Sequence, residues 1–232
     1  MKNELYQNLL YELSKCEKCT NLKKKNEKDC SLINIYKDND FCKNIPSIWT
    51  DWFNRLNSKL MIIGQDWGPY TDMKMLNELY TKNPNKDNWN YLIEQEKSNT
   101  KKQLEYYIKE TSNNEYSLDN IFITNAIMCA RKGINYRGDN IELKKSTNNC
   151  SNYLKKQIEI VKPKVILTLG YYPILSLSQS YNFEIGRNLK ETIIKSPEIK
   201  VNNYIIIPLY HPVAQIKKSE QIKQYNRIWK YV

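Results

Sequence analysis

Residues 60–72 read LMIIGQDWGPYTD, an apolar run that passes directly into a polar loop flanked by two glycines. The run at 60–64 is continuous rather than alternating, which is typical of a strand buried on both faces of a parallel sheet. Three later runs have the same character, namely IFITNAIM at 121–128, VILTLG at 165–170 and YIIIPL at 204–209. The chain therefore has four candidate strands for one parallel sheet.

Segments with helical spacing separate these runs. They lie at about 73–110, 144–161, 171–180 and 218–231. An amphipathic helix with leucines at positions 5, 9, 10 and 13 precedes them all and is expected to end near Cys16. Alternating strands and helices predict an α/β fold with right-handed crossovers. We expect a three-layer α/β/α sandwich around a central four-stranded, mostly parallel sheet.

The 232 residues suit one domain with polar insertions at about 20–57 and 81–117, because no second core or proline-rich linker is visible. No apolar run approaches the roughly 18 to 20 residues of a membrane span. The first residues lack the apolar block of a secretory signal. We therefore expect a cytoplasmic protein, most simply a monomer, that does not bind membranes.

The charge balance indicates a class of partner. Lys and Arg number 36 against 25 Asp and Glu, which gives a net charge of +11. Such a surplus attracts a polyanion, and nucleic acid is the most common one in a cell. The Lys-, Asn-, Ile- and Tyr-rich composition of an AT-rich genome would also produce this surplus.

Ligands of such sheets bind beyond the carboxyl ends of the strands, and polar side chains follow three of these ends. Asp66 and Asp72 lie in the loop after the first strand, where Asp72 could simply cap a helix. Asn125 ends the second strand and presents one acceptor and two donors, which suit a base edge or a turn. His211, the only histidine, follows the fourth strand and is an acid–base candidate rather than a structural residue.

In their order, these motifs resemble the uracil-DNA glycosylase superfamily, and most closely its iron–sulfur family-4 and family-5 branch. The pattern comprises CxxC, a G-x-x-x-G loop, TN-x-x-x-C, a further Cys, a strand ending in LG and a strand ending in HP. These are Cys16–Cys19, Gly64–Gly68, Thr124–Cys129, Cys150, Leu169–Gly170 and His211–Pro212.

The resemblance implies an enzyme that flips a deaminated base out of DNA and hydrolyses its N-glycosidic bond. His211 would donate to the base oxygen, and Asn125 would read the base. Family 4 usually has GEAPG where this chain has GQDWG, which is similar to the family-1 motif GQDPYH. By that likeness, Asp66 would orient or activate the water. Gly64 and Gln65 would line the base pocket. Tyr70 or Trp67 would also line it, as the group that excludes thymine.

The resemblance also implies a [4Fe–4S] cluster on Cys16, Cys19, Cys129 and Cys150. The cluster would be structural, and no other small-molecule cofactor is expected. A local zinc site on Cys16, Cys19, Cys30 and Cys42 is the alternative.

DNA contacts are expected around the mouth of the pocket. The basic candidates are Arg131, Lys132, Arg137, Lys217 and Lys218. Ile216 is the candidate for insertion into the gap that a flipped base leaves. A solvated basic rim is the alternative for the cations.

The leading hypothesis is a monofunctional DNA glycosylase for uracil or another deaminated or modified base. It predicts base release without strand cleavage, because no lysine is clearly placed as a Schiff-base nucleophile. The second hypothesis is a non-catalytic DNA-binding sensor of modified or damaged DNA, motivated by the altered loop and by Val213, where related enzymes have serine. An unrelated α/β enzyme with a zinc ribbon ranks third. A variant whose histidine attacks the sugar ranks lowest, since its GEQPG motif is absent.

Overall fold

The computed structural model describes residues 1–19, 32–37, 52–82, 99–131 and 143–232. Its centre is a five-stranded sheet in the order β3-β2-β5-β7-β6. The strands are β2 (Leu60–Gly64), β3 (Phe122–Asn125), β5 (Val165–Leu169), β6 (Ile199–Val201) and β7 (Tyr204–Leu209). The first four in spatial order are parallel, whereas β6 pairs antiparallel with β7. The predicted α/β fold is confirmed, and each predicted strand contributes to the sheet.

Two details of the predicted sheet are wrong. The sheet has a fifth strand, because the short β6 forms a hairpin with β7 through Asn202 and Asn203, and Asn202 has a φ of 51°. The predicted strand 121–128 is also too long. Its main-sheet part ends at Asn125, and the chain then turns into β4 (Ala130–Arg131), which pairs antiparallel with β1 (Leu32–Ile33).

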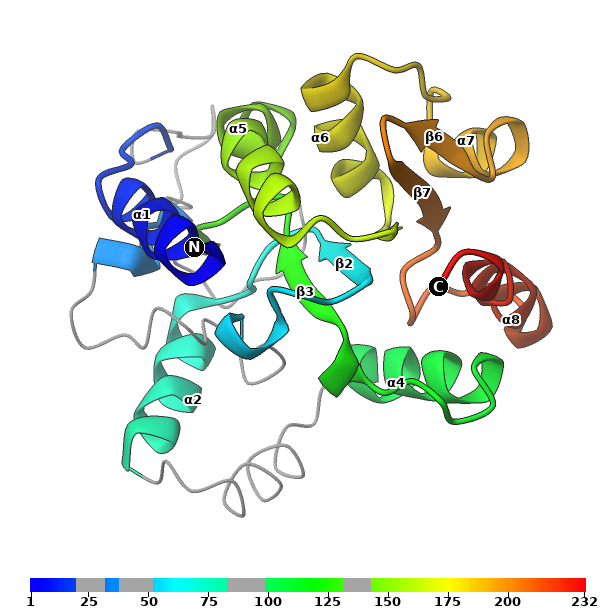
Figure 1. Cartoon of the computed structure of the whole chain (residues 1–232), viewed down its shortest axis with the longest axis horizontal. Helices are drawn as coiled ribbons and strands as arrows, with labels where there is room; N and C mark the ends of the chain where they lie inside the picture. Colours follow the sequence, from blue (N-terminus) through cyan, green and yellow to red (C-terminus); the bar gives the residue numbers. More distant parts are fainter. Residues whose placement is uncertain (20–31, 38–51, 83–98, 132–142) are drawn as a thin grey trace.

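Alternate residues of the central strands pack into two different hydrophobic cores, one on each face of the sheet. Met61 and Ile63 belong to one buried cluster, whereas Leu60 and Ile62 belong to the other. Figure 1 shows α1 (Lys2–Ser14), α5 (Leu143–Val161) and α6 (Tyr171–Tyr181) side by side on the first face. The second face is covered by α4 (Asn99–Thr111) and α8 (Lys218–Tyr225), which pack on each other. The layers are therefore helix, sheet and helix.

The remaining elements complete these layers. They are α2 (Tyr70–Lys82), α7 (Leu189–Lys195) and the short 3-10 helices η1 (Ile35–Lys37), η2 (Phe53–Arg55), η3 (Leu118–Asn120) and η4 (Ile228–Lys230). No helix in the described ranges is long and apolar enough to span a membrane.

Both predicted insertions contain residues of the core. Leu104 and Ile108 of α4 are fully buried against the second face of the sheet, although they lie in the range 81–117. Trp52, in the range 20–57, stacks on Phe122 at 6.1 Å and donates from Nε1 to the carbonyl oxygen of Ile123. These parts of the predicted insertions therefore stabilise the sheet itself.

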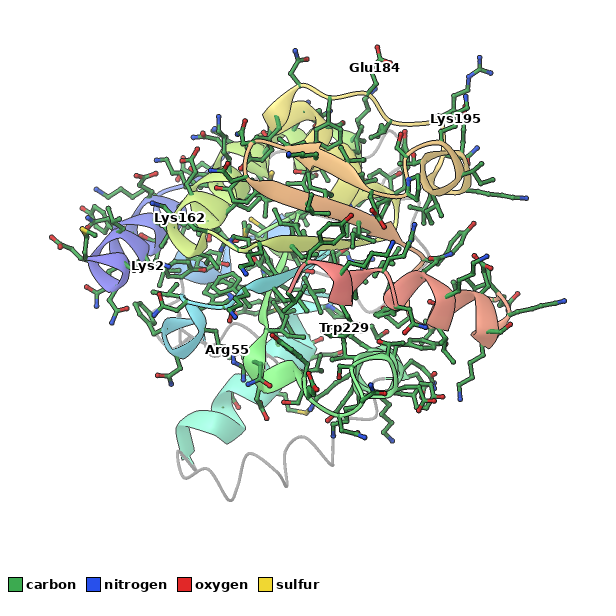
Figure 2. The ribbon with its side chains drawn as sticks, turned by 45° about the vertical axis from the view of Figure 1, so that its right-hand side comes forward. Lys2, Arg55, Lys162, Glu184, Lys195 and Trp229 are labelled. Carbon is green, nitrogen blue, oxygen red and sulfur yellow. The ribbon has the colours of Figure 1, made fainter. Side chains whose placement is uncertain are left out.

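The amino-terminal helix is fastened to the end of α5. Nζ of Lys2 donates to the carbonyl oxygens of Leu56 and Val161, at 2.8 and 2.9 Å. Lys162 follows α5 directly, and Figure 2 shows it beside Lys2. Desolvation, and then the nearby charge of Lys162, lower the pKa of Lys2. These contacts hold α1 across the sheet, with Cys16 just beyond its last turn.

Candidate active site

The four parallel strands bring their carboxyl ends to one edge of the sheet. The pairing aligns Gly64 with Asn125, and Leu169 with Leu209. Neighbouring strands lie about 4.8 Å apart, so the end of β7 is roughly 10 Å from the end of β2, with β5 between them. The loops that carry Asp66, Asn125 and His211 therefore leave the same edge, as the sequence predicted.

Gly64 is required because Asn125 lies against it. A Cβ at position 64 would overlap Oδ1 of Asn125, and the φ of Gly64 is not in the left-handed region. Asn125 is 8% exposed, and its amide has no hydrogen-bond partner within the described ranges. The backbone of the next residue, Ala126, donates to the carbonyl oxygen of Gly64 at 2.8 Å. The amide is thus nearly enclosed, and its polar atoms are available to a ligand.

We expect Gly64→Ala to lower the free energy of unfolding by about 1–3 kcal/mol, because the added methyl group must displace the Asn125 amide. In an Asn125→Ala background, the same change should cost much less, since the overlapping atom is gone. Urea unfolding of the four proteins measures both costs.

Gly170→Ala is the matched control for this experiment. Gly170 has a φ of 97° and open space where its Cβ would lie. Its replacement is strained by the backbone alone, and the cost should be equal in both backgrounds. An equal cost of Gly64→Ala in both backgrounds would contradict the proposed contact.

The loop after β2 is closed by a buried ion pair. Oδ1 of Asp66 accepts from Nε and a terminal nitrogen of Arg131, at 3.0 and 2.8 Å, and from the backbone N–H of Gly68. Its Oδ2 accepts from Nε2 of Gln65 at 2.8 Å. The Asp66 side chain is only 2% exposed and that of Arg131 is 14% exposed. The predicted catalytic acid is therefore engaged with protein donors.

This ion pair changes how Arg131 is interpreted. Arg131 was expected to meet DNA, but its guanidinium is directed at Asp66, and its backbone N–H donates to the carbonyl oxygen of Gly68 at 2.9 Å. Sequence reasoning placed both partners at the ligand and did not detect that they bind each other. Of the other expected DNA contacts, Lys217 and Lys218 are exposed and Ile216 is half-buried. Lys132 and Arg137 lie outside the described residues.

The two aromatic candidates of the loop differ in their contacts. Nε1 of Trp67 donates to the carbonyl oxygen of Met128 at 3.0 Å, and its ring meets Trp52 edge to face at 5.7 Å. Tyr70 is the first residue of α2 and is half-buried against the same core. The indole of Trp67 is thus fixed from the protein side. Asp72 lies in the first turn of α2, where the sequence also allowed it as a helix cap.

His211 is solvent-accessible at the end of β7, while its backbone is anchored from α8. Nε2 of Gln221 donates to the carbonyl oxygens of His211 and Pro212, each at 3.2 Å. Gln221 is 1% exposed. Partial burial of the imidazole lowers its pKa below the ordinary value. The lowered pKa favours the neutral ring at pH 7, which can donate one N–H.

Gln221 and its neighbour Gln224 were missed by the sequence analysis. Both are buried, and Oε1 of Gln224 faces the backbone N–H of Tyr210 at 3.5 Å. The available signal was their spacing of three residues, which puts them on one face of the last helix.

The four predicted cysteine ligands come from three segments. Cys16 and Cys19 follow α1, Cys129 precedes β4, and Cys150 lies on α5. All four are free thiols, and all but Cys16 are buried. A hydrogen bond from Cys150 lowers the pKa of Cys19, and burial raises that of Cys129 to about 12. The thiols thus gather in one region.

A ready metal site is not formed there. Within the described ranges, no group of three or more His, Cys, Asp or Glu side chains has an arrangement that could hold a metal ion. The chemistry of the donors nevertheless fits an iron–sulfur cluster, which is bound by four thiolates with hydrogen bonds to its sulfurs. Nδ2 of Asn149 already donates to Sγ of Cys19 at 3.5 Å. Cys30 and Cys42, the alternative zinc ligands, lie outside the described residues.

Comparison with known proteins agrees with the geometry of this edge. The model of the uracil DNA glycosylase superfamily matches residues 50–232. A type-4 uracil-DNA glycosylase of Sulfurisphaera tokodaii is 34% identical over 104 residues, which cover 42% of this chain and 43% of that relative. The chain thus matches less than half of the relative's length. The family match contains the Gly64 loop, Asn125, His211 and two of the four cysteines, and it begins after Cys16 and Cys19.

Proposed function

The chain belongs to the uracil DNA glycosylase superfamily, and we propose that it hydrolyses the N-glycosidic bond of uracil, or of another deaminated base, flipped out of DNA. The observation that carries the proposal is the presence of two polar groups at the carboxyl edge of the sheet, one at the end of β3 and one after β7. The Asn125 amide is nearly buried with no partner in the described part of the chain, and the accessible imidazole of His211 follows β7.

Asn125 would read the base. Its amide offers a donor and an acceptor side by side, which match the acceptor oxygen and the ring N–H of uracil. Cytosine presents the reverse pattern and would leave buried polar groups unpaired, at about 1–3 kcal/mol each. The close packing of the amide against Gly64 supports this role, because it limits the positions that the amide can take before the base arrives. Gln65 and the backbone of Gly64 would line the same pocket.

The residue that screens out thymine is proposed to be Tyr70. Trp67 is held by Met128 and Trp52 from the protein side, whereas Tyr70 begins α2 beside the loop. A ring there would meet the extra methyl group of thymine.

His211 would stabilise the departing base. As the bond to the sugar breaks, negative charge develops on the base oxygen, and a fixed N–H donor lowers the energy of that state. The neutral imidazole supplies this donor at pH 7, because burial lowers its pKa. Gln221 acts as a positioning residue, since it holds the backbone on which the imidazole is mounted.

Asp66 is proposed to hold the loop rather than to act only on a water. Its carboxylate accepts from Arg131, Gly68 and Gln65. Both bonds from Arg131 go to Oδ1, whereas Oδ2 accepts only from Gln65, so direct contact with the attacking water, as predicted from the sequence, would use Oδ2. The two roles are separated by the double-mutant experiment on Asp66 and Arg131 argued in the Discussion.

An iron–sulfur cluster on Cys16, Cys19, Cys129 and Cys150 completes the proposal. The cluster would tie the segment after α1 to β4 and α5, and its chemistry would be structural. Cys129 is two residues from Arg131, so the ligand segment also carries the partner of Asp66. The curated relative is named a type-4 uracil-DNA glycosylase, and the resemblance to that branch supports the cluster.

Replacing Cys129 or Cys150 with serine is expected to abolish iron binding and the visible absorbance of the purified protein. Replacing Cys30 or Cys42 should leave both unchanged, because an intact cluster needs only four thiolates. Iron, sulfide and zinc content are measured on protein purified without oxygen. One zinc and no iron, lost on replacement of Cys30 or Cys42, would contradict the cluster.

The function is tested by base release from single- and double-stranded oligonucleotides that contain uracil, hypoxanthine or xanthine. The expected result is release of one base without strand cleavage. The measurement compares the amount of free base released with the amount of oligonucleotide cleaved at the abasic site. Tight and selective binding to one modified oligonucleotide without any release would support a non-catalytic sensor. The engagement of Asp66 by Arg131 is the observation that favours this second function.

A further inference from the structure

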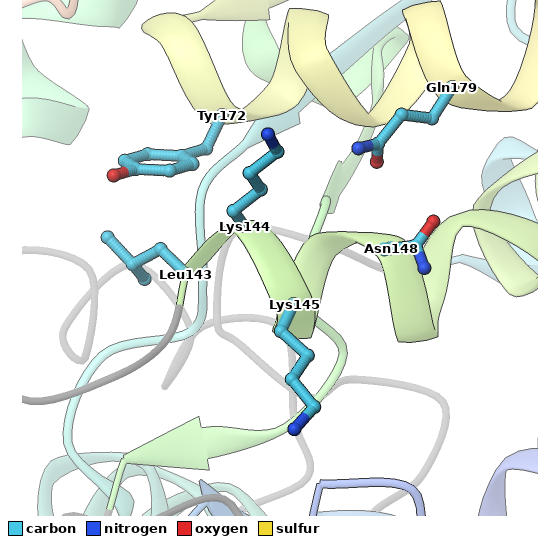
Figure 3. A pocket seen from close by; sticks show the side chains of 6 residues that line it. All are labelled: Leu143, Lys144, Lys145, Asn148, Tyr172 and Gln179. Atoms are coloured by element: carbon cyan, nitrogen blue, oxygen red, sulfur yellow. The ribbon is translucent and has the colours of Figure 1, made fainter. Parts of the chain in front are cut away.

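A surface pocket of about 600 Å³ lies between α5 and α6. Six of the described residues line it: Leu143, Lys144, Lys145, Asn148, Tyr172 and Gln179. Figure 3 shows the side chains that line it, with those of α5 on one side and those of α6 on the other. Among the described residues that line the pocket, none carries a carboxylate. None of these residues was assigned a role in the base site.

This α5–α6 pocket lies toward the carboxyl edge of the sheet, the edge at which the base site is also found. α6 begins directly after Gly170, at the carboxyl end of β5. α5 ends at Val161, shortly before β5 starts, so its first turn also lies toward the carboxyl edge. The backbone N–H of Gly170 donates to the carbonyl oxygen of Leu209, two residues before His211. A strand whose base enters the site can therefore continue toward the pocket.

The polar groups of the pocket fit a DNA strand. Lys144 is exposed, and its ammonium group points toward α6 between Tyr172 and Gln179 (Figure 3). Lys145 extends in another direction, and its charge acts on Cys19 instead. The Tyr172 ring is half-buried and meets Tyr171 edge to face at 6.1 Å. A cation near an aromatic ring is a combination that proteins use to bind a phosphodiester and stack its neighbouring base.

We propose that the α5–α6 pocket binds the DNA strand beside the flipped nucleotide, with Lys144 on a backbone phosphate and Tyr172 against the adjoining base. The proposal rests on the proposed function for its ligand, since it places the pocket next to an extruded base. It extends that function by assigning a strand-binding subsite outside the base pocket.

The test measures binding rather than catalysis. Affinity for a labelled single-stranded oligonucleotide without any modified base is determined at several salt concentrations for wild type, Lys144→Ala and Tyr172→Ala. Loss of one phosphate contact should reduce the slope of log affinity against log salt by about 0.7 for a single strand. Lys144→Ala should therefore bind several-fold more weakly at low salt. Tyr172→Ala should weaken binding about tenfold without a change of slope, because stacking is not ionic.

Lys164→Ala is the matched control. Lys164 is also exposed but precedes β5 at the opposite edge of the sheet. Equal slopes for Lys144→Ala and Lys164→Ala would overturn the proposal. Competition by inorganic phosphate or a mononucleotide as effective as that by the oligonucleotide would overturn it as well, since the pocket would then take a free anion.

The outcomes distinguish this proposal from the proposed function. A smaller salt slope in Lys144→Ala, with no base release from any substrate, would support the strand-binding pocket and contradict the proposed glycosylase activity. Base release by wild type, with an unchanged salt slope in Lys144→Ala, would contradict only the proposed strand-binding pocket. Absence of all DNA binding would contradict both proposals.

Discussion

His211→Ala is expected to lower single-turnover base release at least about 100-fold, because removal of one preorganised donor to a developing oxyanion costs that much in comparable sites. DNA affinity should stay close to that of wild type, since the donor is needed only as the base leaves. The measurement is release of the preferred base under excess enzyme, together with binding of the uncleaved oligonucleotide.

His211→Gln is the control for this prediction. Glutamine keeps an N–H donor of similar reach, so its release rate should lie between those of wild type and His211→Ala. A fall of less than about threefold in His211→Ala would contradict the assigned donor, since it is far below the expected loss.

The protonation state of His211 can be checked directly. It is the only histidine, so its ring gives one imidazole signal in a titration followed by NMR. The midpoint should fall below the ordinary value of about 6.5, because burial disfavours the charged ring. Base release that depends on the neutral ring would then rise with pH only in the acid range and level off before pH 7. A midpoint above 6.5 would contradict the neutral donor.

The sheet was predictable because its signal is local. Each of the four parallel strands is a continuous apolar run. Such a run indicates a strand buried on both faces even when its neighbours in the sheet are not known. β6 and α7 were not predicted, since they are short and their residues are mostly half-exposed. α4 was read as part of an insertion because polar residues dominate its composition, while its packing depends mainly on Leu104, Tyr107 and Ile108.

The site was predictable as a set of loops but not as a set of contacts. Strand ends in a parallel sheet must share an edge, so Asn125 and His211 could be placed together from the sequence. The contact between Asp66 and Arg131 joins residues 65 positions apart, and no local pattern marks it. The sequence assigned Asp66 to the water by its likeness to GQDPYH and Arg131 to DNA by its charge, and the structure adds a contact between the two.

Asp66→Asn and Arg131→Gln are each expected to lower the free energy of unfolding by about 3–5 kcal/mol, because either change leaves a buried charge without its partner. The double variant should be less destabilised than the sum of the two, by an interaction energy of about 1–3 kcal/mol. Urea unfolding of all four proteins gives this energy. Additive losses would show that the ion pair does not exist in solution.

Base release in the same four proteins decides the role of Asp66. If its carboxylate acts by holding the loop, Arg131→Gln should reduce release as much as Asp66→Asn, at least about 100-fold for the loss of a fixed site. The double variant should then be no slower than either single variant, since both remove one contact. Because the Asp66 carboxylate accepts from donors of three residues and its side chain is 2% exposed, this is the result we expect. A fast Arg131→Gln beside a slow Asp66→Asn would instead assign the carboxylate to the attacking water.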